Sequence, residues 1–112
     1  TYQTQKKSEI LGVSEDLIKE KTVVSEEVAQ AMSLGCQKLF KTDISLSTTG
    51  VAGPNSDEFE SEIGTVFYSI RVQNFEKTFK LYLPHLERKD FMNFVSMKVL
   101  QDLIEILIKE KI

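Results

Sequence analysis

A chain of 112 residues, 41% of them hydrophobic and 28% charged, has the size and balance of a single globular domain with one core. Its net charge of −3 and the absence of a basic stripe disfavour nucleic-acid binding, but they do not exclude a single nucleotide as a ligand. The one cysteine, Cys36, excludes an internal disulfide, and the lack of a signal peptide or a membrane-length apolar run predicts a reducing, cytoplasmic location without membrane contact.

The first predicted elements are helices. Ser14 and Ser25 each precede acidic residues, as an N-cap does at the start of a helix. After Ser25, apolar and small residues recur at the spacing of one helical face, namely Val28, Ala31, Met32, Gly35, Cys36, Leu39 and Phe40. Because Gly35 lacks a side chain, we expect it to let this helix approach a sheet closely.

Three segments with alternating polarity follow and predict strands over residues 43–49, 65–72 and 77–83. A turn near Gln73 and Asn74 predicts a hairpin between the second and third strands. Residues 88–111 predict a long helix, whose broad apolar stripe favours packing on the sheet and on a second partner, either a missing element or another subunit. This order predicts one layered α/β/α domain over residues 1–112, with a central mixed sheet and truncated at its amino terminus.

Several short motifs carry a resemblance to a known family. Tyr-Gln-Thr-Gln-Lys-Lys occupies residues 2–7, and Ile-Leu-Gly-Val follows at 10–13. Val-Ser-Glu-Glu-Val-Ala stands at 24–29, Ser-Thr-Thr-Gly-Val-Ala-Gly-Pro at 47–54 and Ile-Gly-Thr-Val at 63–66. In this order and spacing they resemble the C-terminal domain of the competence/damage-inducible protein CinA, the nicotinamide-nucleotide amidase family, over essentially the whole chain.

The resemblance implies a reaction: hydrolysis of the carboxamide of nicotinamide mononucleotide to nicotinic acid mononucleotide and ammonia, in pyridine nucleotide salvage, with no metal or cofactor. Members of the family carry a Glu-Ser-x-Thr-Gly-Gly segment whose serine is the nucleophile. That segment does not occur in these residues. We therefore expect it upstream of residue 1, and we expect the 112-residue chain alone to be inactive.

The resemblance also implies catalytic residues. The tyrosine and lysine of the family's Tyr-x-Asn-x-x-Lys motif align with Tyr2 and Lys7. A serine needs a base to become a nucleophile, and a lysine with a lowered pKa is that base in Ser-Lys enzymes. We expect Lys7 to be the base and Tyr2 to relay the proton or orient the substrate. Without the resemblance, Lys7 is typical of a solvated surface lysine.

Small residues after the first predicted strand are expected to line the substrate site, because ligands of open α/β sheets bind beyond the carboxyl ends of strands. Backbone N–H groups in such a bend approach a phosphate or a developing oxyanion closely. Taken alone, the segment is more typical of an ordinary turn. The resemblance, in which the family's Thr-Gly turn aligns with Thr49 and Gly50, favours the site instead. With it, the expected substrate-binding residues are Thr4, Thr48, Thr49, Gly50, Gly53 and Arg88.

Departures from the family pattern support an alternative function. Thr4 stands where the family often has Asn, Ser56 and Asp57 stand where it has a glycine pair, and Met92 takes the place of a second arginine beside Arg88. The departures at Ser56, Asp57 and Met92, together with the broad apolar face of the last helix, favour a non-catalytic nucleotide-binding or oligomerisation module. The acidic run at 57–62 lacks calcium-loop spacing, so we expect no metal site.

Overall fold

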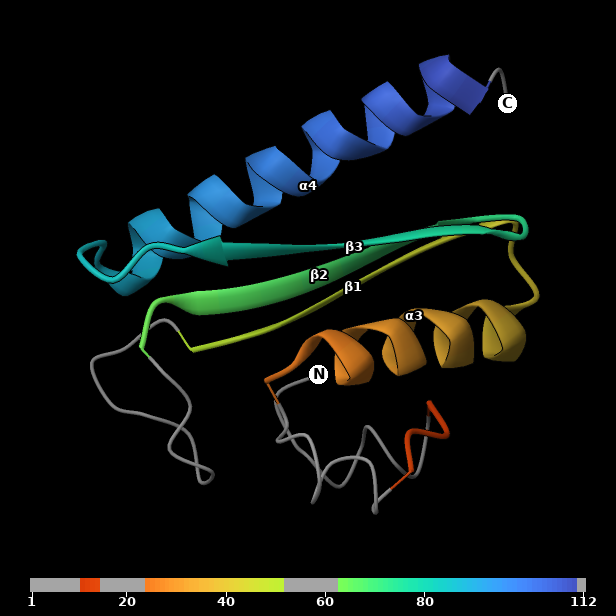
Figure 1. The fold of residues 1–112 in the computed structure, drawn as a ribbon, viewed down its shortest axis with the longest axis horizontal. Coiled ribbons are helices and arrows are strands. Elements are labelled where there is room, and N and C mark those ends of the chain that lie inside the picture. The colour runs from red at the N-terminus through yellow and green to blue at the C-terminus, as the bar shows by residue number, and fades with distance from the viewer. Residues whose placement is uncertain (1–10, 15–23, 52–62, 111–112) are drawn as a thin grey trace.

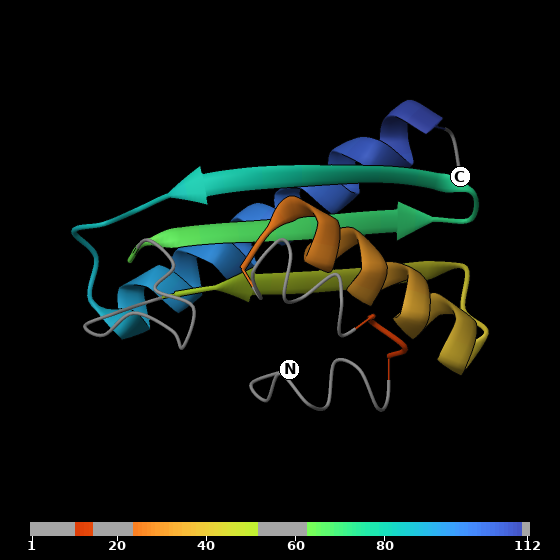
Figure 2. The same cartoon turned by 60° about the horizontal axis from the view of Figure 1, so that its bottom comes forward.

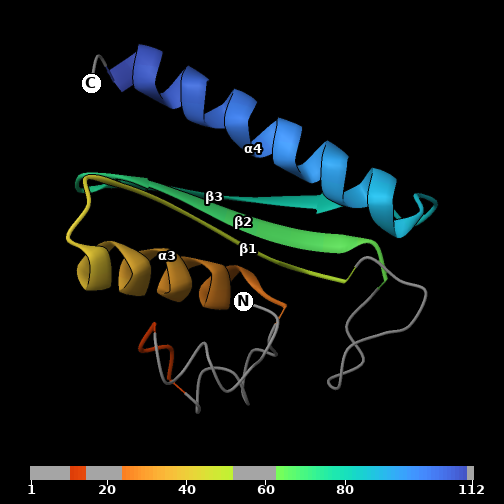
Figure 3. The same cartoon turned by 180° about the vertical axis from the view of Figure 1, so that it is seen from behind.

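The computed structural model describes residues 11–14, 24–51 and 63–110. In chain order these form α3 (Glu26–Phe40), β1 (Ile44–Gly50), β2 (Thr65–Val72), β3 (Phe75–Tyr82) and α4 (Arg88–Glu110). Figure 1 shows α3 on one face of the sheet and α4 on the other, and the reverse view in Figure 3 shows the same three layers. The predicted layered α/β/α arrangement is confirmed. The helix predicted after Ser14 lies outside the described residues.

The sheet has the order β1-β2-β3, and both strand pairs are antiparallel. The predicted hairpin is confirmed: Val72 pairs with Phe75 across a tight turn in which Gln73 has a φ of 54°. The expected mixed sheet is wrong for the described residues, which contain no parallel pair. A two-residue turn joins only antiparallel strands, whereas a parallel pair needs a long crossover.

Helix α3 begins and ends as its sequence predicts. The Ser25 hydroxyl oxygen accepts a hydrogen bond from the Val28 N–H at 3.2 Å, and Glu26 and Glu27 occupy the first turn. The Ser25 hydroxyl pairs one of the N–H groups that the first turn leaves without a partner. The two acidic residues stabilise the positive end of the helix dipole. The helix ends at Lys41, which adopts the left-handed conformation with a φ of 53°.

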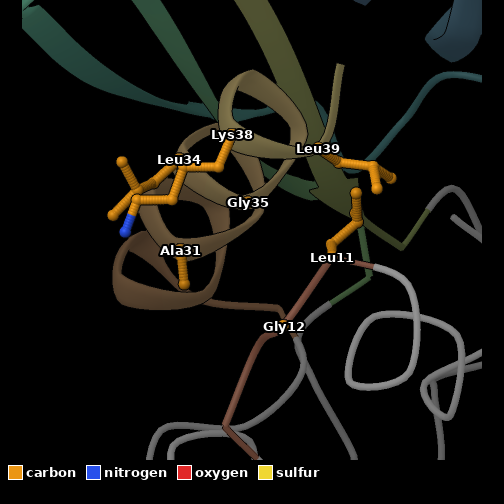
Figure 4. Close-up of a pocket in the computed structure, with 7 residues that line it drawn as sticks. All are labelled: Leu11, Gly12, Ala31, Leu34, Gly35, Lys38 and Leu39. Atoms are coloured by element: carbon orange, nitrogen blue, oxygen red, sulfur yellow. The ribbon is translucent and has the colours of Figure 1, made fainter. Parts of the chain in front are cut away.

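Gly35 allows a close approach, but to a different segment from the one expected. A Cβ atom at Gly35 would lie 1.7 Å from the carbonyl oxygen of Leu11, so it is the chain at Leu11 that packs against the helix there, not the sheet. Figure 4 shows Leu11 and Gly12 beside the part of α3 that carries Gly35. The reason is that the opposite face of α3 is the one that meets the strands.

The contact between α3 and the sheet is built from hydroxyl groups. Ser45 donates a hydrogen bond to the Ser33 carbonyl oxygen at 2.7 Å, and Ser47 donates to the Ala29 carbonyl oxygen at 2.6 Å. The hydroxyls of Ser33 and Ser69, both fully buried, lie 2.8 Å apart. Small side chains let the helix lie close to the strands, and their hydrogen bonds offset the loss of water. The serine side of β1 is therefore its buried side.

Apolar packing dominates the α4 side of the sheet. The buried cluster there consists of Val66, Tyr68, Ile70, Val72, Phe91, Val95, Val99 and Ile106. The Tyr68 ring stacks on Phe79 with 4.9 Å between centroids. Its hydroxyl donates a hydrogen bond to the buried Asp102 carboxylate, which also lies 3.5 Å from the Lys98 ammonium nitrogen. This polar contact fixes α4 on an otherwise apolar surface.

The Tyr68–Asp102 contact leads to a stability prediction. Burial raises the pKa of Tyr68 above its ordinary value of 10, and the hydrogen bond and negative charge of Asp102 raise it further. Because the folded pKa exceeds the unfolded one, this contribution to stability is complete below pH 10 and is lost as pH rises toward the folded pKa. Tyr68→Phe should unfold about 1–3 kcal/mol more easily at pH 7, because Asp102 loses its buried donor.

Urea unfolding at several pH values between 7 and 11 measures both effects. The free energy of unfolding of the unchanged protein should fall more steeply above pH 10 than that of Tyr68→Phe. Parallel pH profiles for the two proteins would show that Tyr68 does not ionise differently in the folded state.

Candidate functional site

Four elements meet at one end of the sheet. β1 ends there at Gly50, β2 begins at Thr65, β3 ends at Tyr82 and α4 begins at Arg88, as Figures 1 and 2 show. Backbone hydrogen bonds continue the ladder past the strands: the Val51 N–H donates to the Thr65 carbonyl oxygen at 3.0 Å, and the Gly64 N–H donates to the Val51 carbonyl oxygen at 2.6 Å. The chain around Val51 is therefore held firmly beside the start of β2.

Two glycines make this sheet end possible. Gly64 has a φ of 89°, and a Cβ atom there would lie 2.5 Å from the Cα atom of Pro84. A Cβ atom at Gly50 would lie 2.8 Å from that of Val66 and 3.0 Å from the Thr65 carbonyl oxygen. At both positions a neighbouring atom lies closer than a Cβ atom allows, so this end of the sheet accepts only glycine there.

Three predicted binding residues, Thr48, Thr49 and Gly50, are the last residues of β1. Side chains alternate along a strand, so Thr49 shares the α3 side with Ser47 and is 5% exposed. Thr48 and Gly50 are exposed and belong to the other face. Arg88, the first residue of α4, is also exposed and lies in the α4 layer. The structure thus brings these residues to one sheet end but to different layers.

The remaining predicted site residues, Tyr2, Thr4, Lys7 and Gly53, lie outside the described residues, as do Ser56 and Asp57. Met92, in contrast, is described. It lies one helical turn after Arg88 on α4 and is 41% exposed. The place of the family's second arginine is therefore accessible beside Arg88, but a thioether offers no charge and no N–H donor to a phosphate.

Thr65 is a residue of this sheet end that the sequence analysis did not single out. Its hydroxyl oxygen is the one buried side-chain polar atom without a hydrogen-bond partner in the part of the chain that the structure describes. A buried hydroxyl left unpaired costs about 1–3 kcal/mol. In the sequence it follows Gly64 within Ile-Gly-Thr-Val, and nothing there distinguishes it from an ordinary strand threonine.

A concave surface lies away from this sheet end, on the outer side of α3 (Figure 4). It encloses about 430 Å³ and is lined by Leu11, Gly12, Ala31, Leu34, Gly35, Lys38 and Leu39. Lys38 is its single ionisable lining residue, so the described lining offers no acid–base pair. Within residues 11–14, 24–51 and 63–110, no three His, Cys, Asp or Glu side chains gather as metal ligands do, and neither helix has the apolar length that crosses a membrane.

Comparison with known proteins identifies the relatives of this chain. The family described as CinA C-terminal domain matches residues 1–107. The CinA-like protein of Geotalea uraniireducens is 38% identical over 96 residues, which cover 86% of this chain and 23% of that protein. The CinA-like protein of Akkermansia muciniphila is 31% identical over 112 residues, which cover 100% of this chain and 27% of that protein.

Solved structures agree with the sequence relatives. The competence-damaged protein (CinA) superfamily protein from Escherichia coli superimposes with a TM-score of 0.89 at 26% identity, covering 96% of this chain and 62% of that one. A competence damage-inducible protein A from Klebsiella pneumoniae gives 0.87 at 25% identity, with 94% and 65% covered. The chain therefore spans about a quarter of the two curated relatives and under two thirds of these two structures.

Proposed function

Because the chain belongs to the CinA C-terminal domain family, we propose that it forms part of a nicotinamide mononucleotide amidase whose substrate binds at the carboxyl end of β1. The observation that supports this most is the end of β1 at Thr49 and Gly50. It lies at the end of the sheet where β2, β3 and α4 also begin or end, and Gly50 has no room for a side chain. Because glycine carries no side chain, an anion can approach its backbone N–H closely.

The proposed reaction proceeds through an acyl-enzyme. The serine of the family's Glu-Ser-x-Thr-Gly-Gly segment, supplied by a longer natural polypeptide, attacks the carboxamide carbon while Lys7 takes the hydroxyl proton. A backbone N–H group at the end of β1 is proposed to stabilise the oxyanion. The C–N bond then breaks, and Lys7 returns its proton to the nitrogen, which leaves as ammonia. A water molecule then attacks the ester while Lys7 takes its proton, and Lys7 returns that proton to the serine oxygen. Tyr2 orients the reacting groups.

The phosphate of the substrate is proposed to meet Arg88. This side chain is exposed at the first turn of α4, where the helix dipole also favours an anion. Thr48, exposed at the end of β1, and Thr4 are proposed to add hydroxyl contacts, and Gly53 is proposed to add a backbone contact. Met92 leaves Arg88 without a second guanidinium, so we expect weaker phosphate binding than a pair of arginines gives.

Ammonia release from nicotinamide mononucleotide tests this proposal. The natural polypeptide that contains these residues should release one ammonia for each nicotinic acid mononucleotide formed, and a variant with alanine for the nucleophilic serine should release none. The 112-residue chain alone should be inactive. The amidase proposal fails if the natural polypeptide forms no ammonia above the blank.

A second candidate function is assembly, and the outer stripe of α4 favours it. Exposed side chains line the helix on the side opposite Phe91, Val95 and Val99; they are Phe94, Met97, Leu100, Ile104 and Ile108. We propose that a second copy of α4 covers this stripe in antiparallel orientation.

Charge in the stripe should abolish this assembly. The double variant Leu100→Glu and Ile104→Glu places four like charges at the centre of the proposed contact, two from each copy, so association should weaken at least about 100-fold. Sedimentation velocity measures the change. Ser96→Glu adds an exposed charge on a flank of α4 outside the stripe and should leave the oligomer intact. A monomer in the unchanged protein would refute the assembly.

A further inference from the structure

One hydroxyl of the sheet end is unlike the others in the described structure. The hydroxyls of Ser33, Ser45, Ser47 and Ser69 are all buried on the α3 side of the sheet, and each has a hydrogen-bond partner. The Thr65 hydroxyl is buried as well, with the residue 6% exposed, and has none among the described residues. Folded proteins pair nearly all such groups, and the exceptions that persist often serve binding or catalysis.

Thr65 lies beside the end of β1. Thr49 pairs with Phe67 in the register of β1 and β2, so Thr65 is its diagonal neighbour two residues along. Side chains two apart in a strand share a face, which places both threonines on the α3 side. The Thr65 backbone is fixed there too, because its carbonyl oxygen accepts from the Val51 N–H at 3.0 Å.

We propose that Thr65 is a further substrate-binding residue, whose hydroxyl contacts the carboxamide of the nucleotide at the end of β1. This inference rests on the proposed amidase function. A carboxamide carries both a donor and an acceptor, and a threonine hydroxyl serves either. The hydroxyl is closed to solvent in the free protein, so substrate binding has to displace the atoms that cover it. The Thr65 hydroxyl is therefore unpaired in the free protein and gains a hydrogen-bond partner, the carboxamide, when the substrate binds.

Thr65→Val tests the inference, because valine keeps the shape of threonine and removes the hydroxyl. In the natural polypeptide, the variant should melt about 3 °C higher, since an unpaired buried group is gone. Its KM for nicotinamide mononucleotide should rise about tenfold, since one hydrogen bond to the substrate is lost. Thr65→Ser keeps the hydroxyl and should restore the KM.

Thr78→Val is the matched control. The Thr78 hydroxyl donates to the Glu76 carboxylate in β3, so the same substitution should lower the melting temperature and leave the KM unchanged. A Thr65→Val protein that is more stable but has an unchanged KM overturns the inference, and so does one that is less stable. If the unchanged polypeptide releases no ammonia, the amidase proposal fails instead, and calorimetric binding of nicotinamide mononucleotide to both proteins then decides the role of Thr65.

Discussion

Replacing Lys7 with alanine should lower kcat for nicotinamide mononucleotide hydrolysis by about 10³-fold or more in the natural polypeptide, the contribution of a well-placed general base. Without the amine, the serine hydroxyl keeps its proton and the departing nitrogen receives none. The KM should change little, because Lys7 acts on the reacting atoms and not on the phosphate or ribose. Steady-state ammonia release measures both constants.

Lys6 provides the matched control for this prediction. It is a lysine at the adjacent position, outside the Tyr-x-x-x-x-Lys spacing, so Lys6→Ala should retain the activity of the unchanged enzyme. Lys7→Arg should be as inactive as Lys7→Ala, because a guanidinium keeps its charge and cannot accept the serine proton. Equal rates for Lys7→Ala and the unchanged enzyme would remove Lys7 from the mechanism.

Gly64→Ala should destabilise the fold by about 3 kcal/mol or more. Two effects add at this position. A φ of 89° strains any residue with a Cβ atom, and that atom would lie 2.5 Å from the Cα of Pro84 and 2.8 Å from the carbonyl carbon of Leu83. Both neighbours are backbone atoms, so β3 and the start of β2 have to separate. Urea unfolding of the variant measures the loss.

Gly12 separates the two effects. It also has a positive φ, 71°, but a Cβ atom there would meet nothing within 4 Å. Gly12→Ala should therefore cost about 1 kcal/mol, from strain alone. If Gly64→Ala loses no more stability than Gly12→Ala, the close packing of Gly64 against Pro84 does not contribute to the fold.

Local signals in the sequence predict much of this architecture. The N-cap at Ser25 and the acidic first turn give the start of α3, and the alternation on either side of Gln73 and Asn74 gives the hairpin. Both are decided by residues within a few positions of each other. The predicted bounds of β3 are less accurate. The strand begins at Phe75, two residues before the predicted start, because the turn contains only Gln73 and Asn74.

Features that depend on contacts between distant residues were not predictable. Gly35 is a helical glycine in the sequence, and only the fold shows that its neighbour is the Leu11 carbonyl. The buried side of β1 is its serine side, contrary to ordinary hydrophobic patterning, because α3 supplies carbonyl oxygens as acceptors. Thr65 likewise differs from any strand threonine only through the partner that it lacks.

The site itself was predictable in part. The position of Thr48, Thr49 and Gly50 at the end of a strand followed from alternation before the bend, and the structure places them there. Their relation to Arg88 did not follow, because the predicted α/β/α layers do not reveal which end of the sheet the start of α4 meets. The roles proposed for Lys7 and Tyr2 rest on the family motif.

A crystal structure of the natural polypeptide with bound nicotinic acid mononucleotide tests the location of the site most directly. We predict that the pyridine carboxylate lies within about 3.5 Å of the Lys7 amine and of a backbone N–H at the end of β1, with the phosphate toward Arg88. A nucleotide bound in the hollow beside Gly35, with the Lys7 amine pointing into solvent, would contradict it.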